Sequence, residues 1–235
     1  MKKMLFPMVI ALCATLSWAA SDRQEAIDRL DMAGKVLKEI MDAPDKGIPE
    51  EVVNGSKCIA VVPHMIKGGF IFGAKHGKGI ATCRTGKGWS APAFFTISGG
   101  SWGLQIGAEG VDLVLMVMNE EGMKNLLSNK FQIGGEASAA GGPVGRHASA
   151  GTDWKADTQI LSYSRAKGAF AGLTLEGAAV RPDEDSTKAI YGKDVSHQAI
   201  LTGKVATPRV AASFLDSVRT ARRQAVTEEK KEGDK

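Results

Sequence analysis

Residues 69–118, GFIFGAKHGKGIATCRTGKGWSAPAFFTISGGSWGLQIGAEGVDLVLMVM, decide the fold, because short apolar runs alternate there with glycine-rich breaks. The runs predict successive β-strands at residues 69–75, 80–85, 89–97, 101–108 and 111–118. The breaks at 76–79, 86–88, 99–100 and 110 predict tight turns, since glycine adopts the positive backbone angles that such turns require. The segment is therefore predicted to be a series of antiparallel hairpins.

One of these strands is predicted to be central in the sheet. Residues 111–118 are apolar on both faces apart from Asp112, which is typical of a strand that is covered on both sides. The small-residue tract 134–151 is either a flexible loop or a set of closely packed strands. Further strands and one more turn are expected at 58–62, 159–165, 166–168 and 170–175.

Helices are expected on both sides of the predicted sheet in the sequence. Apolar residues recur at helical spacing in the ranges 21–43, 119–128, 183–191 and 208–223. Residues 227–235 carry charges of both signs and are expected to form a disordered tail. We therefore predict one α+β domain at 21–226, with an antiparallel β-rich meander or barrel-like core and the N- and C-terminal helices packed on it.

Residues 1–20 have the pattern of a signal peptide. Lys2 and Lys3 form a basic start, residues 5–16 are apolar, and Ala19 and Ala20 provide small residues for cleavage. The apolar run is shorter than the roughly 20 residues that a membrane span needs. We expect an exported protein of the periplasm or cell surface that associates peripherally with the membrane.

Basic residues are concentrated in one part of the chain, although the net charge is only +4. Residues 52–108 contain no Asp or Glu. The cations of this stretch are Lys57, Lys67, Lys75, Lys78, Arg84 and Lys87. Their field is expected to attract phosphate groups, on lipid or on nucleic acid. The alternative is that they are solvated turn residues that keep sheet edges soluble.

Two cysteines, Cys58 and Cys83, lie beyond the predicted signal peptide. In an oxidising compartment they can form a disulfide. The alternative is a pair of small buried residues on separate strands, since a sequence does not report the geometry that a disulfide requires. Both interpretations stay open at this point.

Sequence motifs of enzymes do not occur in this chain. It has no phosphate-binding loop, no dinucleotide fingerprint and no complete nucleophile elbow. The histidines His64, His76, His147 and His197 form no metal-ligand pair at short spacing. A triad of His147, Ser149 and Asp153 is the one catalytic arrangement to weigh, and such residues are common in loops. We expect no enzymatic activity, no metal and no cofactor.

Nucleic acid is not an expected partner. Aromatic side chains that are able to stack on bases occur near the basic stretch, at Phe70, Phe72, Trp89, Phe94 and Phe95. Their positions within predicted strands favour a place in the core instead.

An ordered set of short blocks resembles the SYLF domain family over residues 30–222. The blocks are Cys58-Ile-Ala-Val-Val-Pro63, Lys67-Gly-Gly-Phe70, Gly77-Lys-Gly79, Cys83-Arg84, Trp89-Ser-Ala-Pro-Ala-Phe94, Gly99-Gly-Ser-Trp-Gly-Leu-Gln-Ile-Gly107, Asp112-Leu-Val-Leu115, Gly142-Pro-Val-Gly-Arg146, Ile160-Leu-Ser-Tyr-Ser-Arg165, Gly168-Ala-Phe-Ala-Gly172 and Leu175-Glu-Gly177. The resemblance implies a lipid-binding domain. Eukaryotic members of the family bind phosphoinositides, a yeast branch also binds and bundles actin, and bacterial members are typically exported.

On this resemblance we predict non-catalytic binding of anionic phospholipid or phosphoinositide-like head groups at a membrane surface. The residues expected to bind them are Lys67, Lys75, Lys78, Arg84 and Lys87. No actin partner is expected, because an exported protein of this type has no actin to bundle. The alternative is a structural envelope protein that binds a protein partner through 134–151 or the terminal helices.

Overall fold

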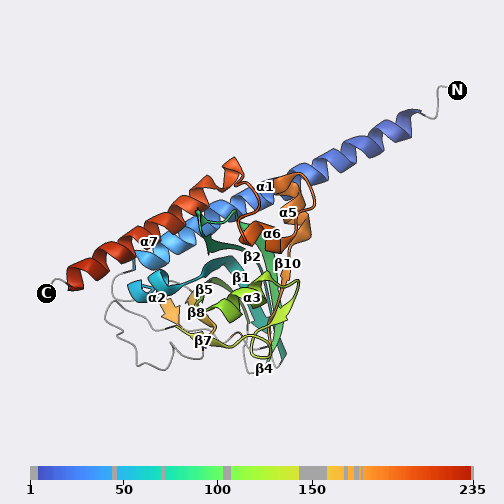
Figure 1. Cartoon of the computed structure of the whole chain (residues 1–235). Coiled ribbons are helices and arrows are strands. Elements are labelled where there is room, and N and C mark those ends of the chain that lie inside the picture. Colours follow the sequence, from blue (N-terminus) through green and yellow to red (C-terminus); the bar gives the residue numbers. More distant parts are fainter. Residues whose placement is uncertain are drawn as a thin grey trace.

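A curled β-sheet with helices packed against it forms the core of the protein (Figure 1). The computed structural model describes residues 5–43, 47–69, 72–102, 107–142, 158–166, 169–171, 175 and 177–233. The strands are β1 (Cys58–Gly69), β2 (Phe72–Thr85), β3 (Gly88–Trp89), β4 (Ala93–Trp102), β5 (Gly107–Val117), β6 (Phe131–Gln132), β7 (Ala139–Gly141), β8 (Ile160–Ala166), β9 (Ala169–Ala171) and β10 (Ala179–Pro182). The helices are α1 (Leu5–Met41), α2 (Glu50–Gly55), α3 (Glu120–Leu127), α5 (Glu184–Tyr191), α6 (His197–Leu201), the 3-10 helix η1 (Arg209–Ala211) and α7 (Ala212–Gly233).

The order of the strands differs from their order in the chain. It runs β6-β10-β4-β2-β1-β5-β8-β7, while β3 pairs with β2 and β9 pairs with β8. Among the described strand pairs, only β7 and β8 are parallel. The predicted α+β class with a barrel-like sheet and terminal helices is therefore confirmed. In the sheet, β1 lies between β2 and β5, so the central strands do not follow each other in chain order.

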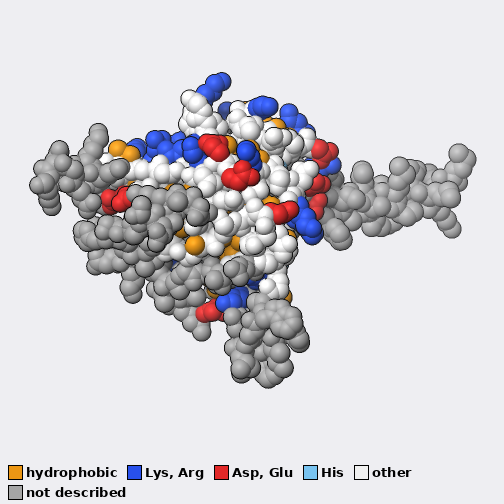
Figure 2. Space-filling view, turned by 60° about the horizontal axis from the view of Figure 1, so that its bottom comes forward, with side chains coloured by type: hydrophobic (Ala, Val, Ile, Leu, Met, Phe, Trp, Pro, Cys, Tyr) orange, Lys and Arg blue, Asp and Glu red, His pale blue; other side chains and the backbone are white. Residues whose placement is uncertain are grey.

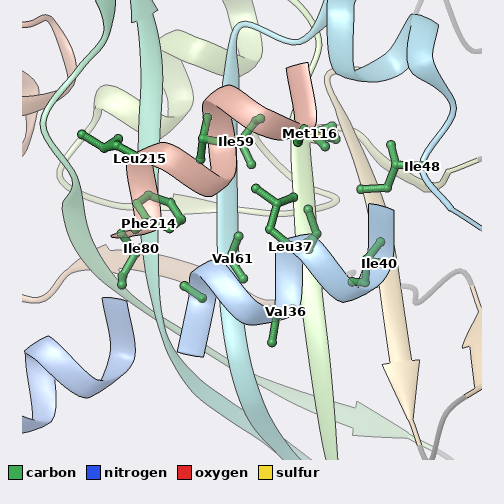
Figure 3. Close-up of a cluster of buried hydrophobic side chains, with 14 of the residues drawn as sticks. Val36, Leu37, Ile40, Ile48, Ile59, Val61, Ile80, Met116, Phe214 and Leu215 are labelled. Atoms are coloured by element: carbon green, nitrogen blue, oxygen red, sulfur yellow. The ribbon is translucent and has the colours of Figure 1, made fainter. Parts of the chain in front are cut away.

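Both faces of the central strands are buried, so the protein has two hydrophobic clusters. Ile59 and Val61 of β1 face α1 and α7, whereas Ala60 and Val62 face the opposite side of the sheet. Figure 3 shows the first cluster, in which Leu37 of α1 and side chains of α7 lie over the sheet. Other members of this cluster are Ile40, Ile48, Ile80, Met116, Phe214 and Leu215. The expectation that 111–118 is buried on both faces is confirmed by β5, whose residues alternate between the two clusters.

Helices α1 and α7 pack closely side by side over the sheet (Figure 1). A Cβ atom on Gly34 would lie 3.0 Å from Ser217 Oγ and 3.5 Å from Phe214 Cα, so glycine allows this close approach. One helical turn away, the Ser213 hydroxyl donates a hydrogen bond of 2.6 Å to Asp31. The position of α7 is thus fixed by direct contact with α1.

Three predicted turns are wrong. The predicted breaks at 76–79, 99–100 and 110 lie inside the strands β2, β4 and β5. Of the four predicted breaks, only 86–88 is a hairpin, between β2 and β3. The physical reason is crowding. A Cβ on Gly77 would lie 2.5 Å from Val62 Cγ1, and one on Gly110 would lie 2.3 Å from His64 Cε1. These glycines make room for neighbouring side chains within the sheet rather than for turns.

The two ends of the domain also differ from the expectation. Helix α1 begins at Leu5, where the sequence predicted a helix from residue 21, and α7 continues to Gly233. Residues 227–233, predicted to belong to a disordered tail, are thus helical. Charges of both signs are compatible with a helix that continues from a packed segment. Within the described residues, no helix combines the length and the apolar character that crossing a membrane requires.

Candidate functional site

The five residues predicted to bind lipid do not form one surface. Lys75 lies near the start of β2 and Arg84 near its end, which is about 30 Å along an extended strand. Lys67 is the register partner of Lys75 on one side and of Glu109 on the other. Lys75 itself is only 6% exposed and has an interaction partner. The two lysines therefore do not present a free pair of charges to a membrane.

An ion pair of Lys78 connects β2 to α1. Its Nζ atom lies 2.9 Å from Glu25 Oε1, and the same oxygen accepts a hydrogen bond of 2.9 Å from Arg29. The hydrogen bond from Lys78, followed by the Lys78 charge and the bond from Arg29, lowers the pKa of Glu25. Lys57 is likewise neutralised, by Glu120 at 3.0 Å. Carboxylates of α1 and α3 thus neutralise two of the cations of residues 52–108, a stretch that has no Asp or Glu of its own.

Arg84 is held by the end of α2. Its Nε donates to the Ser56 carbonyl at 2.7 Å, and Nη2 donates to the carbonyls of Val53 and Asn54, both at 2.9 Å. The guanidinium carbon lies 5.1 Å from the centroid of the Trp89 ring. Burial, and next the charge of Arg222 on α7, lowers the pKa of Arg84.

The remaining predicted residue, Lys87, is exposed at the hairpin between β2 and β3. The chain beyond α6 lies against this hairpin, because a Cβ on Gly203 would be 3.0 Å from Thr85 Cγ2. Lys204 follows directly and is exposed. The hairpin and the α6–α7 connection therefore carry Lys87 and Lys204 at one side of the molecule.

We call the surface formed by Arg84, Lys87, Lys204 and Arg222 the cationic edge. Arg222 is exposed on α7, which packs against α2, the helix whose end holds Arg84, and its charge contributes to the lowered pKa of Arg84. Figure 2 shows Lys and Arg side chains concentrated along the side of the molecule on which α7 lies in Figure 1. Within the described residues, no carboxylate forms an ion pair with a member of this edge.

Sequence reasoning missed half of the cationic edge. Lys204 and Arg222 belong to a second basic stretch, residues 202–226, in which Asp216 is the one acidic residue. Asp216 is bound by Arg219 at 2.7 Å. The signal is therefore present in the charge pattern, but from the sequence residues 208–223 of this stretch are assigned only to an amphipathic helix, and Lys204 has no assigned role.

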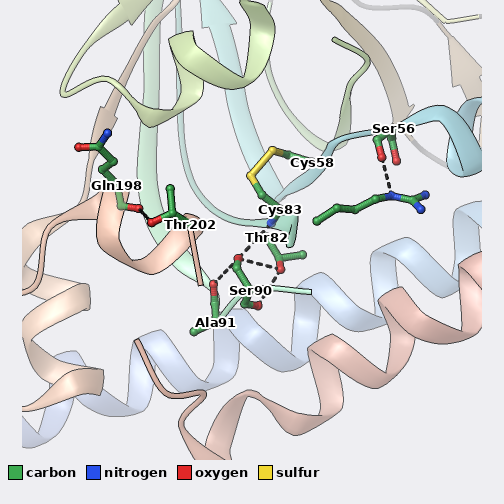
Figure 4. The surroundings of a disulfide bond; sticks show 9 residues. Ser56, Cys58, Thr82, Cys83, Ser90, Ala91, Gln198 and Thr202 are labelled. Atoms are coloured by element: carbon green, nitrogen blue, oxygen red, sulfur yellow. Dashed lines mark hydrogen bonds between the residues drawn. A yellow bond between two sulfur atoms is a disulfide. The ribbon is translucent and has the colours of Figure 1, made fainter. Parts of the chain in front are cut away.

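A disulfide joins the strands next to the cationic edge. Cys58 on β1 and Cys83 on β2 are register partners, and their sulfur atoms are 2.05 Å apart. The Cys83 amide donates to Ser90 Oγ at 3.1 Å. Figure 4 shows the disulfide beside this hydrogen bond and near Ser56, whose carbonyl accepts the hydrogen bond from Nε of Arg84. The backbone that carries Arg84 is thus cross-linked to the centre of the sheet.

Three of the residues weighed for catalysis or metal binding fall outside the described part of the chain. His147, Ser149 and Asp153 lie outside the described residues. Among the described side chains, no group of three or more His, Cys, Asp or Glu is placed to hold a metal ion. His197 is buried beside a surface cavity of about 320 Å³, and burial lowers its pKa to about 4.

Comparison with known proteins finds matches over most of the chain. The family model Ysc84, described as Las17-binding protein actin regulator, matches residues 98–221. Protein YSC84 of Saccharomyces cerevisiae is 30% identical over 192 residues, which are 78% of this chain and 41% of that protein. SH3 domain-containing YSC84-like protein 1 of Rattus norvegicus is 31% identical over 191 residues, 78% of this chain and 56% of that protein.

LAS seventeen-binding protein 3 of Saccharomyces cerevisiae is 30% identical over 168 residues, 70% of this chain and 36% of that protein. The chain therefore spans about half of the length of these relatives, or less. The family description and the name of this relative refer to Las17 binding and actin regulation. These names differ from the expectation that actin is not a partner.

Proposed function

Because the chain belongs to the SYLF family, which the comparison names Ysc84, we propose that it binds anionic phospholipid surfaces and catalyses no reaction. The observation that carries the proposal is the cationic edge. Four basic side chains from β2, its hairpin, the α6–α7 connection and α7 lie at one side of the protein. Lys75 and Lys78 are left out of the proposed surface, because Lys75 is buried and Lys78 is paired with Glu25. Lys67 is left out because it lies in β1 opposite Lys75, at the far end of β2 from Arg84.

The charges of this edge fit weak and reversible adsorption. Each basic residue near an anionic membrane contributes about 1 kcal/mol, and the attraction falls off within a Debye length. Lys87, Lys204 and Arg222 are exposed, so their side chains are able to reach head groups without rearrangement of the core. An edge of this size adsorbs to a membrane but does not insert into it.

We also propose that the protein acts outside the cytoplasm, in the periplasm or at the cell surface. Residues 1–20 have the order of basic, apolar and small residues that a signal peptide has. The disulfide between Cys58 and Cys83 supports an oxidising compartment, because disulfides persist there and are rare in reducing ones. Peripheral attachment through the cationic edge would keep such a protein at a membrane.

Vesicle co-sedimentation tests the proposal. We expect the protein to sediment with phosphatidylglycerol or cardiolipin vesicles at low salt, and not with phosphatidylcholine vesicles. Binding should weaken steeply between 50 and 300 mM NaCl, values chosen to shorten the Debye length. Absence of binding to anionic vesicles at the lowest salt would contradict the proposal.

A second candidate function is the binding of a protein partner, and the names of the relatives favour it. The family description and LAS seventeen-binding protein 3 both refer to binding of Las17. A pull-down that recovers one stoichiometric protein, from a chain that is indifferent to lipid, would support this candidate instead. Recovery of actin in that experiment would overturn the expectation that actin is not a partner.

A further inference from the structure

A surface cavity of about 320 Å³ is lined by the start of α5, the α5–α6 connection and the start of α6. Its volume is at the lower end of the range of about 300 to 1,000 Å³ that is typical of small-molecule sites. None of the four residues of the cationic edge is among the residues that line it. The cavity is therefore separate from the proposed membrane-binding surface.

A buried histidine with an unused nitrogen forms part of the cavity wall. His197 is only 6% exposed, and within the described part of the chain its Nδ1 atom has no hydrogen-bond partner. A buried polar atom without a partner is costly, because it has lost its bonds to water. Burial lowers the pKa of His197 to about 4, so the ring is neutral at pH 7. A neutral imidazole has one nitrogen that accepts a hydrogen bond, and His197 can offer it to a ligand.

The other polar side chains of the cavity that bear on a ligand are also acceptors. The Thr187 hydroxyl is buried and donates to the Asp183 carbonyl at 2.8 Å, so only its lone pairs remain. Glu184 is exposed and forms no ion pair with a described cation. Asp194 has only an exposed contact with Lys188 at 3.3 Å, and such a pair contributes little.

An anion and a metal ion both fit these groups poorly. The side chains of Asp183 and Ser196 cap α5 and α6 by accepting hydrogen bonds of 3.1 and 3.2 Å from their first turns. The carboxylates of Glu184 and Asp194 would repel an anion. Among the described side chains, no group of three or more His, Cys, Asp or Glu is placed to hold a metal ion. The lining therefore favours an organic cation.

We propose that this cavity binds a primary alkylammonium group, with the Glu184 carboxylate, the His197 imidazole and the Thr187 hydroxyl as acceptors. An ammonium group has three N–H donors and no acceptor, and its hydrogen bond to a carboxylate is charge-assisted and therefore strong. Pro182 and Val195 also line the cavity and supply apolar contact for the alkyl chain. The same group ends a free polyamine and a lysine side chain, so the experiment includes both sources.

NMR titration of the full chain at pH 7 measures the binding of two amines. The probes are putrescine and a lysine whose amino and carboxyl ends are both blocked as amides. We expect saturable binding with a dissociation constant on the order of 1 mM. Tighter binding of putrescine would identify a free polyamine as the ligand, and tighter binding of the blocked lysine would identify a protein side chain.

Tetramethylammonium is the control ligand, because it carries a positive charge but has no N–H group. It should not bind. Saturable binding of neither amine, or equal binding of tetramethylammonium, would overturn the site.

The matched variants are Glu184→Gln and Asp185→Asn. Both residues are exposed in the first turn of α5, and each substitution removes one negative charge, but only Glu184 lines the cavity. E184Q should weaken amine binding about tenfold, and D185N should change it less than about twofold. Equal losses in the two variants would show that general charge attracts the amine and would overturn the site.

His197→Phe tests the imidazole separately, since it keeps an aromatic ring and removes both nitrogens. H197F should weaken amine binding as E184Q does, and unchanged binding would overturn the role of His197. If H197F does not fold, E184Q decides alone, because Glu184 is exposed. The inference does not rest on the proposed function: E184Q leaves the cationic edge intact, so its vesicle co-sedimentation should equal that of the wild-type protein.

Discussion

A Cβ atom on Gly79 would lie 2.4 Å from Cζ of Phe95. The two residues are register partners on β2 and β4, and Val62 Cγ2 would be 2.8 Å from the same Cβ. An alanine at position 79 must therefore displace a buried aromatic ring. We expect Gly79→Ala to lower the free energy of unfolding by about 2 kcal/mol or more, measured by urea denaturation.

Gly86→Ala is the matched control for this substitution. Gly86 lies in the hairpin after β2, and a Cβ there would meet no atom within 4 Å. We expect its free energy of unfolding to stay within about 0.5 kcal/mol of the wild-type value. If both variants were equally stable, the glycines of β2 would not be needed for close packing.

This pair of glycines shows why part of the fold was predictable and part was not. The apolar residues of β5 are buried on both faces of the sheet. A strand that is apolar on both faces is typically covered on both sides, so its central position was predicted correctly. Gly79 and Gly86 look alike in the sequence, since both stand beside a lysine in a glycine-rich run. Only Phe95 and Val62, which reach Gly79 from other strands, distinguish a crowded strand from a turn.

The candidate site shows the same limit. Lys78 and Lys87 both stand between glycines in the sequence, but Lys78 meets Glu25 from α1, and Lys87 lies in a real hairpin. A charge count along the chain does not report which carboxylates arrive from distant segments. Arg222 joins Arg84 for the same reason, through the packing of α7 on α1 and α2.

The disulfide should contribute measurably to stability. Cys58 and Cys83 are 25 residues apart in sequence, and a cross-link that closes such a loop stabilises the folded state by about 3 kcal/mol in the chain-entropy model. We expect the double variant Cys58→Ala with Cys83→Ala to lose about this amount in urea denaturation. With reducing agent, the free energy of unfolding of the wild-type protein should fall to a similar value. Equal stability with and without the agent would contradict a disulfide between Cys58 and Cys83.

Arg29 should be one of the most sensitive positions of α1. It is 4% exposed, and its Nη1 donates to Asp183 at 3.0 Å and to Ser186 Oγ at 3.2 Å. Arg29→Met would leave the Asp183 carboxylate buried without its cation. We expect a loss of about 3 kcal/mol in the free energy of unfolding.

Two further variants check that interpretation. Adding Asp183→Asn to Arg29→Met should restore part of the lost stability, because no charge is then left unpaired. Lys38→Met removes an exposed ion pair with Asp42 and should leave the urea midpoint unchanged. A loss in Lys38→Met as large as that in Arg29→Met would mean that burial does not set the energy of these pairs.

Stability should fall as the pH drops from 7 to 5. Burial lowers the pKa of His197 from 6.5 to about 4, so in this range the unfolded chain binds a proton that the folded chain does not. The folded state therefore loses stability as the pH falls, by about 2 kcal/mol over this interval. The lowered pKa of Glu25 acts only below its ordinary value of 4.5 and does not interfere.

Urea denaturation of His197→Gln at the two pH values measures this contribution. The variant should show a clearly smaller difference between pH 7 and pH 5 than the wild-type protein, whatever its stability at pH 7. An unchanged difference would show that another group causes the pH dependence.

The most direct test of the central claim compares two charge-matched double variants in vesicle co-sedimentation. Lys87→Gln with Lys204→Gln removes two charges from the cationic edge, and Lys130→Gln with Lys193→Gln removes two exposed charges outside it. With phosphatidylglycerol vesicles at low salt, we expect the first variant to bind about tenfold more weakly or worse, and the second to bind nearly as the wild-type protein does. Equal binding by the two variants would contradict adsorption through the cationic edge.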